Sequence, residues 1–144
     1  MKFLKIFYII FEFYVFLIYI KNTNKQKKFK IMNKITNVQI SVLYDMFIDN
    51  GLILVEAHKD HVVSMDKEFM DKMTWLVEFN KQILIAAENN NNIDFIELNE
   101  LVLDLILKAK EIRDTYPRYS IGYPYFNSIY DRTKEGFVEL ANTI

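Results

Sequence analysis

The 144-residue chain has no cysteine, three glycines, two prolines, three arginines and two histidines. The absence of cysteine excludes disulfide bonds, thiolate zinc sites, iron–sulfur clusters and a cysteine nucleophile. All-β domains need many turns, which glycine and proline supply, so the scarcity of both residues favours long helices. Hydrophobic residues make up 51% of the chain and charged residues 26%. This balance predicts a folded domain with a hydrophobic core rather than a disordered chain.

The formal net charge of −1 conceals a strong asymmetry along the chain. Residues 1–31 carry seven lysines and one glutamate, a net charge of +6. Residues 32–144 carry eleven basic and eighteen acidic side chains, a net charge of −7, and most of the acid lies in residues 45–111. Such a surface repels phosphate backbones, so we expect no nucleic-acid binding and favour a basic protein as the partner.

Residues 1–31 have the features of a membrane anchor. Lys2 and Lys5 are followed by an apolar run that only Glu12 interrupts, and no Ala, Gly or Ser is present to form a signal-peptidase site. An uncleaved anchor over residues 3–20 would span about 27 Å as a helix, slightly less than a hydrocarbon core of about 30 Å. The lysines that follow the apolar run would then place the remaining chain in the cytoplasm, and a membrane-tethered accessory protein follows as an alternative function.

A second interpretation of the same residues is a misassigned leader. Phe, Ile, Lys, Tyr and Asn, the residues that AT-only codons encode, make up 24 of the first 31 residues but only 44 of the other 113. Translated AT-rich leader DNA would have this composition, and Met32 would then be the true start. Both interpretations define residues 32–144 as the helical domain and predict that it is cytoplasmic.

The hydrophobic pattern of residues 32–144 predicts an all-α fold, a compact bundle of four to five antiparallel helices. Thr36 or Asn37 is expected to cap a first helix that ends at about Asn50, with Gly51 just past its C-terminus. Residues 52–63 fit either a short helix or two short extended runs about a turn, and we favour the helix.

Two further helices have recognisable ends. The second is expected to begin at Ser64 or Asp66 and to run to about Glu88. The third follows Asp94, which forms a capping-box pattern with the glutamate three residues later. Pro117 should end this third helix, because proline lacks the backbone N–H and restricts the residue before it. The last helix is expected to begin near Asp131 or Thr133.

The segment between these last two helices, YPRYSIGYPYFNSIYDR, occupies residues 116–132. It holds five of the nine tyrosines, both prolines and two of the three arginines. Tyrosine and arginine are enriched among the residues that carry binding energy at protein interfaces. The segment therefore predicts a partner-binding surface, with these candidate residues: Arg118, Tyr119, Tyr123, Tyr125 and Arg132.

Packing within the molecule is the alternative interpretation of this segment. Tyrosine rings hold a long connection to a helical domain well, and Arg113, Arg118 and Arg132 would then pair with acidic helices of the same chain. The two roles are compatible in one segment. Tyr116 and Phe126 would point inward, while Tyr119 and Tyr123 would point outward.

The two histidines, His58 and His61, lie in the sequence EAHKDH. Residues three apart share a face of a helix, so both imidazoles would reach one metal ion, and a metal-dependent helical enzyme follows as an alternative function. Two solvated histidines in an acidic stretch are the simpler interpretation. The sequence contains no glycine-rich phosphate loop, serine nucleophile elbow or H-E-x-x-H zinc motif, so we favour a non-catalytic protein without a cofactor.

A tyrosine- and proline-rich stretch followed by DRTKEGF at residues 131–137 is similar in kind to the tail of the colicin DNase immunity proteins. Those proteins are small acidic four-helix inhibitors. The likeness covers about thirty residues; the preceding helix spacing departs from the family, and Thr133 and Lys134 stand where the family has Ser-Pro. The resemblance implies an inhibitory version of the protein-binding role.

Overall fold

The computed structural model describes residues 34–61, 67–89 and 93–143. These residues form four α-helices and no β-strand: α3 (Asn37–His61), α4 (Lys67–Glu88), α5 (Phe95–Asp114) and α6 (Gly122–Ala141). The all-α expectation is thus confirmed for this part of the chain. The anchor or leader expected in residues 1–31 lies outside the described residues.

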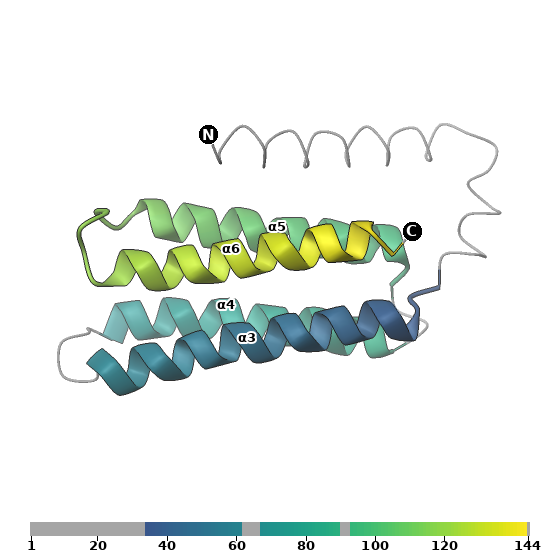
Figure 1. The fold of residues 1–144 in the computed structure, drawn as a ribbon, viewed down its shortest axis with the longest axis horizontal. Helices are drawn as coiled ribbons and strands as arrows, with labels where there is room; N and C mark the ends of the chain where they lie inside the picture. The colour runs from purple at the N-terminus through teal and green to yellow at the C-terminus, as the bar shows by residue number, and fades with distance from the viewer. Residues whose placement is uncertain (1–33, 62–66, 90–92, 144) are drawn as a thin grey trace.

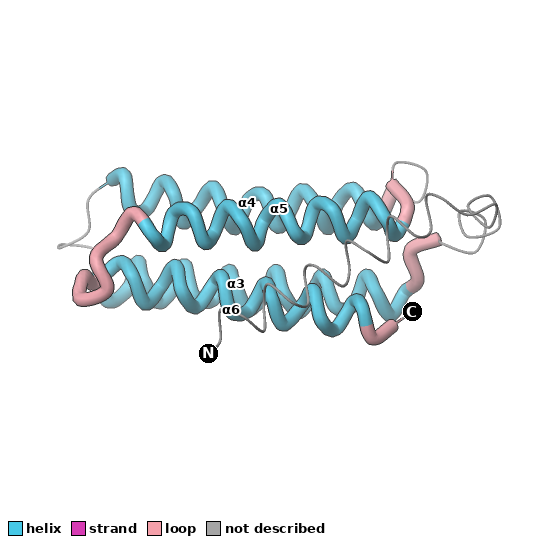
Figure 2. The backbone as a smooth tube through the Cα atoms, turned by 90° about the horizontal axis from the view of Figure 1, so that it is seen from above, coloured by secondary structure: helices cyan, strands magenta, loops and turns pink. Residues whose placement is uncertain are grey.

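The four helices lie side by side, and consecutive helices run in opposite directions (Figure 1). Seen from above, α4 and α5 form one layer, and α3 and α6 form the other (Figure 2). Each helix packs against the helices next to it in this square: α3 and α5 both contact α4 and α6. The α5–α6 connection lies at the end of the molecule where α3 ends and α4 begins (Figure 1).

One hydrophobic core fills the space between the helices. Its fully buried side chains recur at spacings of three and four, which places them on one face of each helix. All four helices contribute, for example Met46 from α3, Leu76 from α4, Leu98 from α5 and Phe137 from α6. Burial of these faces, more than intrinsic helix propensity, stabilises helices of this length.

Two helix starts carry the caps that the sequence predicts. Before α3, the Thr36 hydroxyl accepts a hydrogen bond from the Gln39 backbone N–H (3.2 Å), and the Thr36 N–H donates to the Gln39 side-chain oxygen (2.9 Å). This reciprocal pair is a capping box. Before α5, the Asp94 carboxylate accepts from the Glu97 backbone N–H at 2.9 Å. Each cap satisfies backbone donors that have no partner within the helix.

The expected end of the first helix at Asn50 is wrong. Gly51 lies inside α3 with no positive φ, and the helix continues without a break to His61. The helical interpretation of residues 52–63 is therefore confirmed as far as His61, and residues 62 and 63 are not described. The core face continues beyond the glycine as well, since Asn50 and Ala57 are both buried. This packing outweighs the cost of about 1 kcal/mol of a glycine within a helix.

The expected start of the last helix near Asp131 or Thr133 is also wrong. α5 ends before Pro117, as predicted, but α6 already begins at Gly122. Pro124 is the third residue of α6, in the first turn, where a missing N–H breaks no intrahelical hydrogen bond. The buried residues of α6 recur at helical spacing from its first turn to its last: Gly122, Phe126, Ile129, Tyr130, Thr133, Gly136, Phe137 and Leu140.

Candidate protein-interaction site

Residues 116–132 thus divide into two parts. The first half of α6, from Gly122 to Arg132, lies against the other helices. Residues 117–120 form a turn at the end of the molecule, which we call the 117–120 turn. The surroundings of each part decide which tyrosines and arginines are available to a partner.

An aromatic cluster anchors the start of α6. Phe126 is fully buried, with its ring centroid 5.2 Å from that of Phe69 and 5.1 Å from that of Tyr116. The half-buried Tyr125 meets Phe69 edge-on at 6.2 Å. Gly122 permits this approach, because a Cβ there would lie 2.8 Å from the Phe69 ring. Such aromatic pairs add about 0.5–1.5 kcal/mol each beyond the area that they bury. Tyr116, Tyr125 and Phe126 therefore hold the connection to the core.

Arg113, near the end of α5, contacts the same part of α6. Its guanidinium carbon lies 4.5 Å from the ring centroid of the buried Tyr130 and 5.7 Å from that of the half-buried Tyr123. Its Nη1 donates to the Asn127 side-chain oxygen at 3.0 Å. The Lys134 ammonium lies 4.3 Å from the Tyr130 ring centroid. Tyr130 is thus a cation–π partner of two basic side chains within the molecule.

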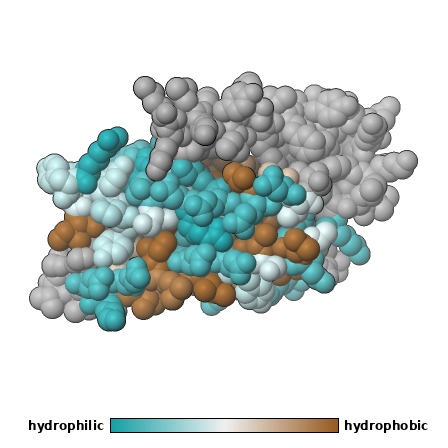
Figure 3. Space-filling model, in the orientation of Figure 1, coloured by the Kyte–Doolittle hydropathy of each residue, from teal (hydrophilic) through white to brown (hydrophobic). Residues whose placement is uncertain are grey.

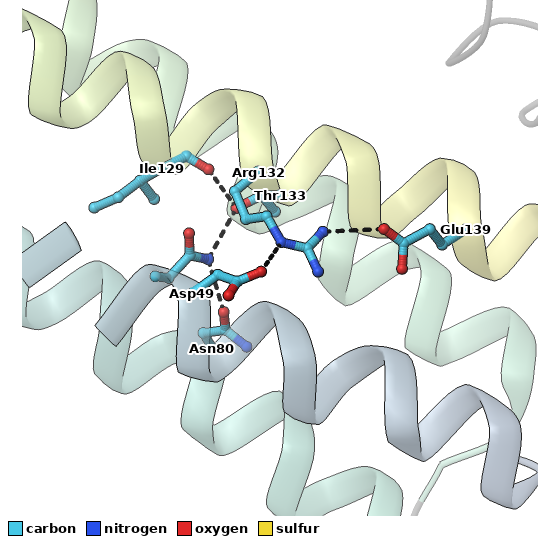
Figure 4. Close-up of polar contacts among 7 residues, drawn as sticks. Asp49, Asn80, Ile129, Arg132, Thr133 and Glu139 are labelled. Carbon is cyan, nitrogen blue, oxygen red and sulfur yellow. Dashed lines mark hydrogen bonds and ion pairs between the residues drawn. The ribbon is translucent and has the colours of Figure 1, made fainter. Parts of the chain in front are cut away.

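Arg132 joins α6 to α3. Its Nε donates to the Asp49 carboxylate at 2.6 Å, and its Nη1 donates to Glu139 at 3.3 Å (Figure 4). Only 14% of the Arg132 side chain is exposed, so these contacts leave little of it for a partner. The structure therefore gives Arg132 an ion-pairing role within the molecule.

A buried polar layer lies beside this ion pair. The Asn50 amide on α3 donates to the Asn80 oxygen on α4 (2.9 Å) and to the Thr133 hydroxyl on α6 (3.3 Å), and Thr133 donates to the Ile129 carbonyl (2.7 Å; Figure 4). Buried polar groups are costly unless hydrogen-bonded, so such a layer favours one register of the helices. Neither the sequence pattern of α3 nor that of α4 predicted it.

The DRTKEGF motif lies within α6, and three of its seven residues take part in the packing of α6 against the other helices. Thr133 belongs to the polar layer, and Phe137 is in the core. At Gly136 a Cβ would lie 2.6 Å from the Met46 sulfur, so glycine allows α6 to approach α3 closely. Helix packing thus accounts for Thr133, Gly136 and Phe137 of this motif.

The 117–120 turn differs from the helical part in the exposure of its side chains. The Pro117 carbonyl accepts hydrogen bonds from both the Ser120 backbone N–H (2.9 Å) and the Ser120 hydroxyl (2.6 Å). These two bonds fix the turn and leave Arg118 and Tyr119 at its tip. Tyr119 is 93% exposed, and Arg118 is exposed and makes no ion pair with any described residue. Beside them, Ile121 is 50% exposed.

Acidic side chains lie near this end of the molecule. Burial raises the pKa of the Tyr125 phenol, and the negative charges of Asp60 and Glu56 on α3 raise it further. Both carboxylates are exposed, and so is Asp114 at the end of α5. The turn therefore presents one aromatic ring and one cation at the end of the molecule that carries Glu56, Asp60 and Asp114, of which Asp114 pairs with Arg113 at 3.0 Å.

The two candidate metal ligands, His58 and His61, both lie on α3. His58 is exposed on α3, and His61 is the last residue of that helix, with a side chain that is not described. Among the described residues, no group of three or more His, Asp or Glu side chains is arranged to hold a metal ion.

α3 has one further property, which concerns its length and hydropathy. Over residues 37–60 it is long and apolar enough to cross a membrane, by length and composition alone. Only 22% of the most apolar stretch is fully buried, but Ile40, Val42, Phe47, Ile53 and Leu54 are half-buried against the core.

Comparisons with known proteins identify no relative of this chain: no protein-family profile, no curated protein and no solved structure matches it.

Proposed function

We propose that residues 32–144 form a small, acidic, non-catalytic protein-interaction module. Its scaffold is a compact antiparallel helical bundle, and its contact surface is the 117–120 turn with the acidic residues next to it. Of the five candidate binding residues, Arg118 and Tyr119 make the contact. Tyr125 and Arg132 support the scaffold, and Tyr123 borders the two regions.

The exposure of Tyr119 on a fixed turn is the observation that carries this proposal. A large aromatic ring that is 93% exposed makes no contribution to the core, whereas Tyr116, Tyr125 and Tyr130 of the same segment pack inward. Because the hydrogen bonds to Pro117 already order the turn, binding would cost little conformational entropy. Tyrosine and arginine are the residue types that most often dominate such contacts.

The charge around the turn indicates the chemistry of the partner. Glu56 and Asp60 would attract a basic protein and accelerate its association. Arg118 would pair with a carboxylate of that partner, and Tyr119 would bury its ring in an apolar pocket. An inhibitor that covers the active site of a basic enzyme is one protein of this kind.

A pair of matched double variants tests the proposal. Full-length protein and Arg118→Ala/Tyr119→Ala are used to capture binding proteins from a native lysate, with Lys81→Ala/Trp75→Ala as the control. The control removes an exposed cation and an exposed aromatic ring from α4. We expect a discrete partner to be captured by the parent chain and the control but not by the turn variant.

Helical circular dichroism and the melting temperature of all three proteins are measured alongside. Loss of capture with an unchanged melting temperature supports the proposal. Equal capture by the turn variant and the parent chain would contradict it, and a large drop in the melting temperature of the turn variant would show that the turn has a structural role instead.

A further inference from the structure

The outer face of α3, opposite the side that packs into the core, carries exposed hydrophobic side chains. Figure 3 shows hydrophobic side chains among hydrophilic ones on the lower face of the molecule, where α3 lies. Four outer positions follow alternating spacings of four and three residues, and we call them the α3 seam: Tyr44, Ile48, Gly51 and Val55. Leu52 lies beside the seam, and the four hydrophobic side chains are 44–59% exposed. Alternation of this kind is typical of a helix that packs lengthwise against another helix.

Nothing in the described structure requires a glycine in the middle of this seam. A Cβ at Gly51 would meet no atom within 4 Å, whereas a Cβ at Gly122 would lie 2.8 Å from the Phe69 ring and one at Gly136 would lie 2.6 Å from the Met46 sulfur. None of these glycines has a positive φ. Glycine within a helix is destabilising relative to alanine. What Gly51 provides is a gap in the seam, through which the backbone of another helix can approach α3 closely.

The edge of the α3 seam that faces α6 is acidic. Asp45 and Glu56 are exposed, and each directly follows a seam residue. Between them, Asp49 already pairs with Arg132 of α6 at 2.6 Å. The whole of α3 carries four carboxylates and one lysine, Lys59. Charges beside a seam of this kind decide which helix it accepts, so the acidic edge favours a helix with lysines and repels one with glutamates.

The α3 seam is ordered before any partner arrives. Its backbone is helical throughout, and at one end the Tyr44 hydroxyl donates a hydrogen bond to the Glu88 carboxylate on α4. A ring that is already held in place loses little rotamer freedom when it is covered. From Tyr44 to Val55 the seam spans about 17 Å, or about three helical turns. A single partner helix of about four turns is therefore long enough to cover it.

We propose that the α3 seam docks one amphipathic α-helix of a partner protein. That helix carries apolar residues at spacings of three and four, with lysines along the edge that meets Asp45 and Glu56. It crosses α3 most closely at Gly51, with Ile48 and Val55 on either side of the crossing. An anionic membrane surface is disfavoured as the occupant, because the same carboxylates repel it. This surface is distinct from the 117–120 turn and does not depend on the proposed function.

Two synthetic peptides test this proposal against the full-length protein. Each is an amphipathic helix of about four turns with leucines at alternating spacings of three and four, and the two differ only in their flanking residues, lysines in one and glutamates in the other. We expect the lysine peptide to bind at least about tenfold more tightly than the glutamate peptide, as measured by fluorescence anisotropy. Similar affinities, or no binding of the lysine peptide, would overturn the proposal.

Gly51→Arg tests the location of the site separately from folding. Arginine is a better helix former than glycine and meets open space at this position, so the melting temperature should not fall. The long cationic side chain fills the gap in the seam, so the lysine peptide should bind at least about tenfold more weakly. Gln82→Arg makes the same change in charge at an exposed position on α4 and should bind the peptide as the parent chain does. Equal affinity of Gly51→Arg and the parent chain would overturn the proposal.

Three other outcomes would also overturn the proposal and identify what happens instead. Loss of peptide binding in Arg118→Ala/Tyr119→Ala would show that the peptide binds the 117–120 turn. A dimer of the chain in sedimentation that Gly51→Arg dissociates would show that a second copy covers the seam. Association with neutral lipid vesicles that Gly51→Arg abolishes would show that this face of α3 lies on a membrane.

Discussion

The 117–120 turn and the first half of α6 have similar compositions and opposite environments. In α6, Tyr125 and Tyr130 pack against rings and cations, and Arg132 pairs with two carboxylates. In the turn, Tyr119 is 93% exposed, and Arg118 is exposed and makes no ion pair with any described residue. Composition therefore identifies residues suited to an interface, but their position relative to the helix axis decides which of them remain available to bind.

The largest expected difference between the two parts is in stability. Phe126→Ala should lower the free energy of unfolding by about 3–5 kcal/mol, because it leaves a cavity where a fully buried ring contacts Phe69 and Tyr116. Tyr119→Ala should change it by less than about 0.5 kcal/mol, since the ring is exposed. Urea unfolding followed by circular dichroism measures both. Similar losses from the two substitutions would contradict the division of the segment.

Replacing Arg132 or Arg118 by methionine should reveal a smaller difference in the free energy of unfolding between the two parts. Arg132→Met should cost about 1 kcal/mol, because it removes an ion pair to Asp49 that solvent only partly screens while keeping the aliphatic stem. Arg118→Met should have no measurable effect on unfolding, because Arg118 makes no ion pair with any described residue. If Arg118→Met proved the more destabilising of the two, the turn would be part of the folded scaffold.

The smallest expected effect appears at alkaline pH. Burial raises the pKa of the Tyr130 phenol, although the Arg113 charge partly opposes this effect. A phenol with a raised pKa in the folded state stabilises the fold below its unfolded pKa of about 10, and this contribution disappears as the pH rises through the folded-state pKa. Tyr130→Phe should therefore lose less stability than the parent chain between pH 9 and pH 11 in urea unfolding. An equal loss would show that ionisation of Tyr130 is not coupled to unfolding.

The sequence predicted the features that depend on local chemistry. The caps at Thr36 and Asp94 and the end of α5 before Pro117 involve residues only a few positions apart, and each is confirmed. The start of α6 also has a local signal in the sequence. Phe126, Ile129 and Tyr130 begin the helical spacing, but the glycine and the second proline just before them indicated a loop.

The remaining features depend on contacts between distant parts of the chain. Arg132 and Asp49 are 83 residues apart, as are Asn50 and Thr133, so no local pattern pairs them. Gly51 has the residue type of a helix end, but the core contacts of α3 on both sides of it keep the helix continuous. The exposure of Tyr119 likewise follows from where α5 ends and α6 begins rather than from its neighbours in sequence.

Photo-crosslinking from the tip of the turn tests the central claim most directly. A photoreactive phenylalanine analogue replaces Tyr119 in full-length protein, and a second variant carries it at Thr74, an exposed position on α4. After irradiation in native lysate, we expect a discrete crosslinked protein from position 119, absent from position 74 and reduced when Arg118 is also changed to Ala. Crosslinking to the same protein from both positions, or from neither, would contradict the assignment of the turn as the contact surface.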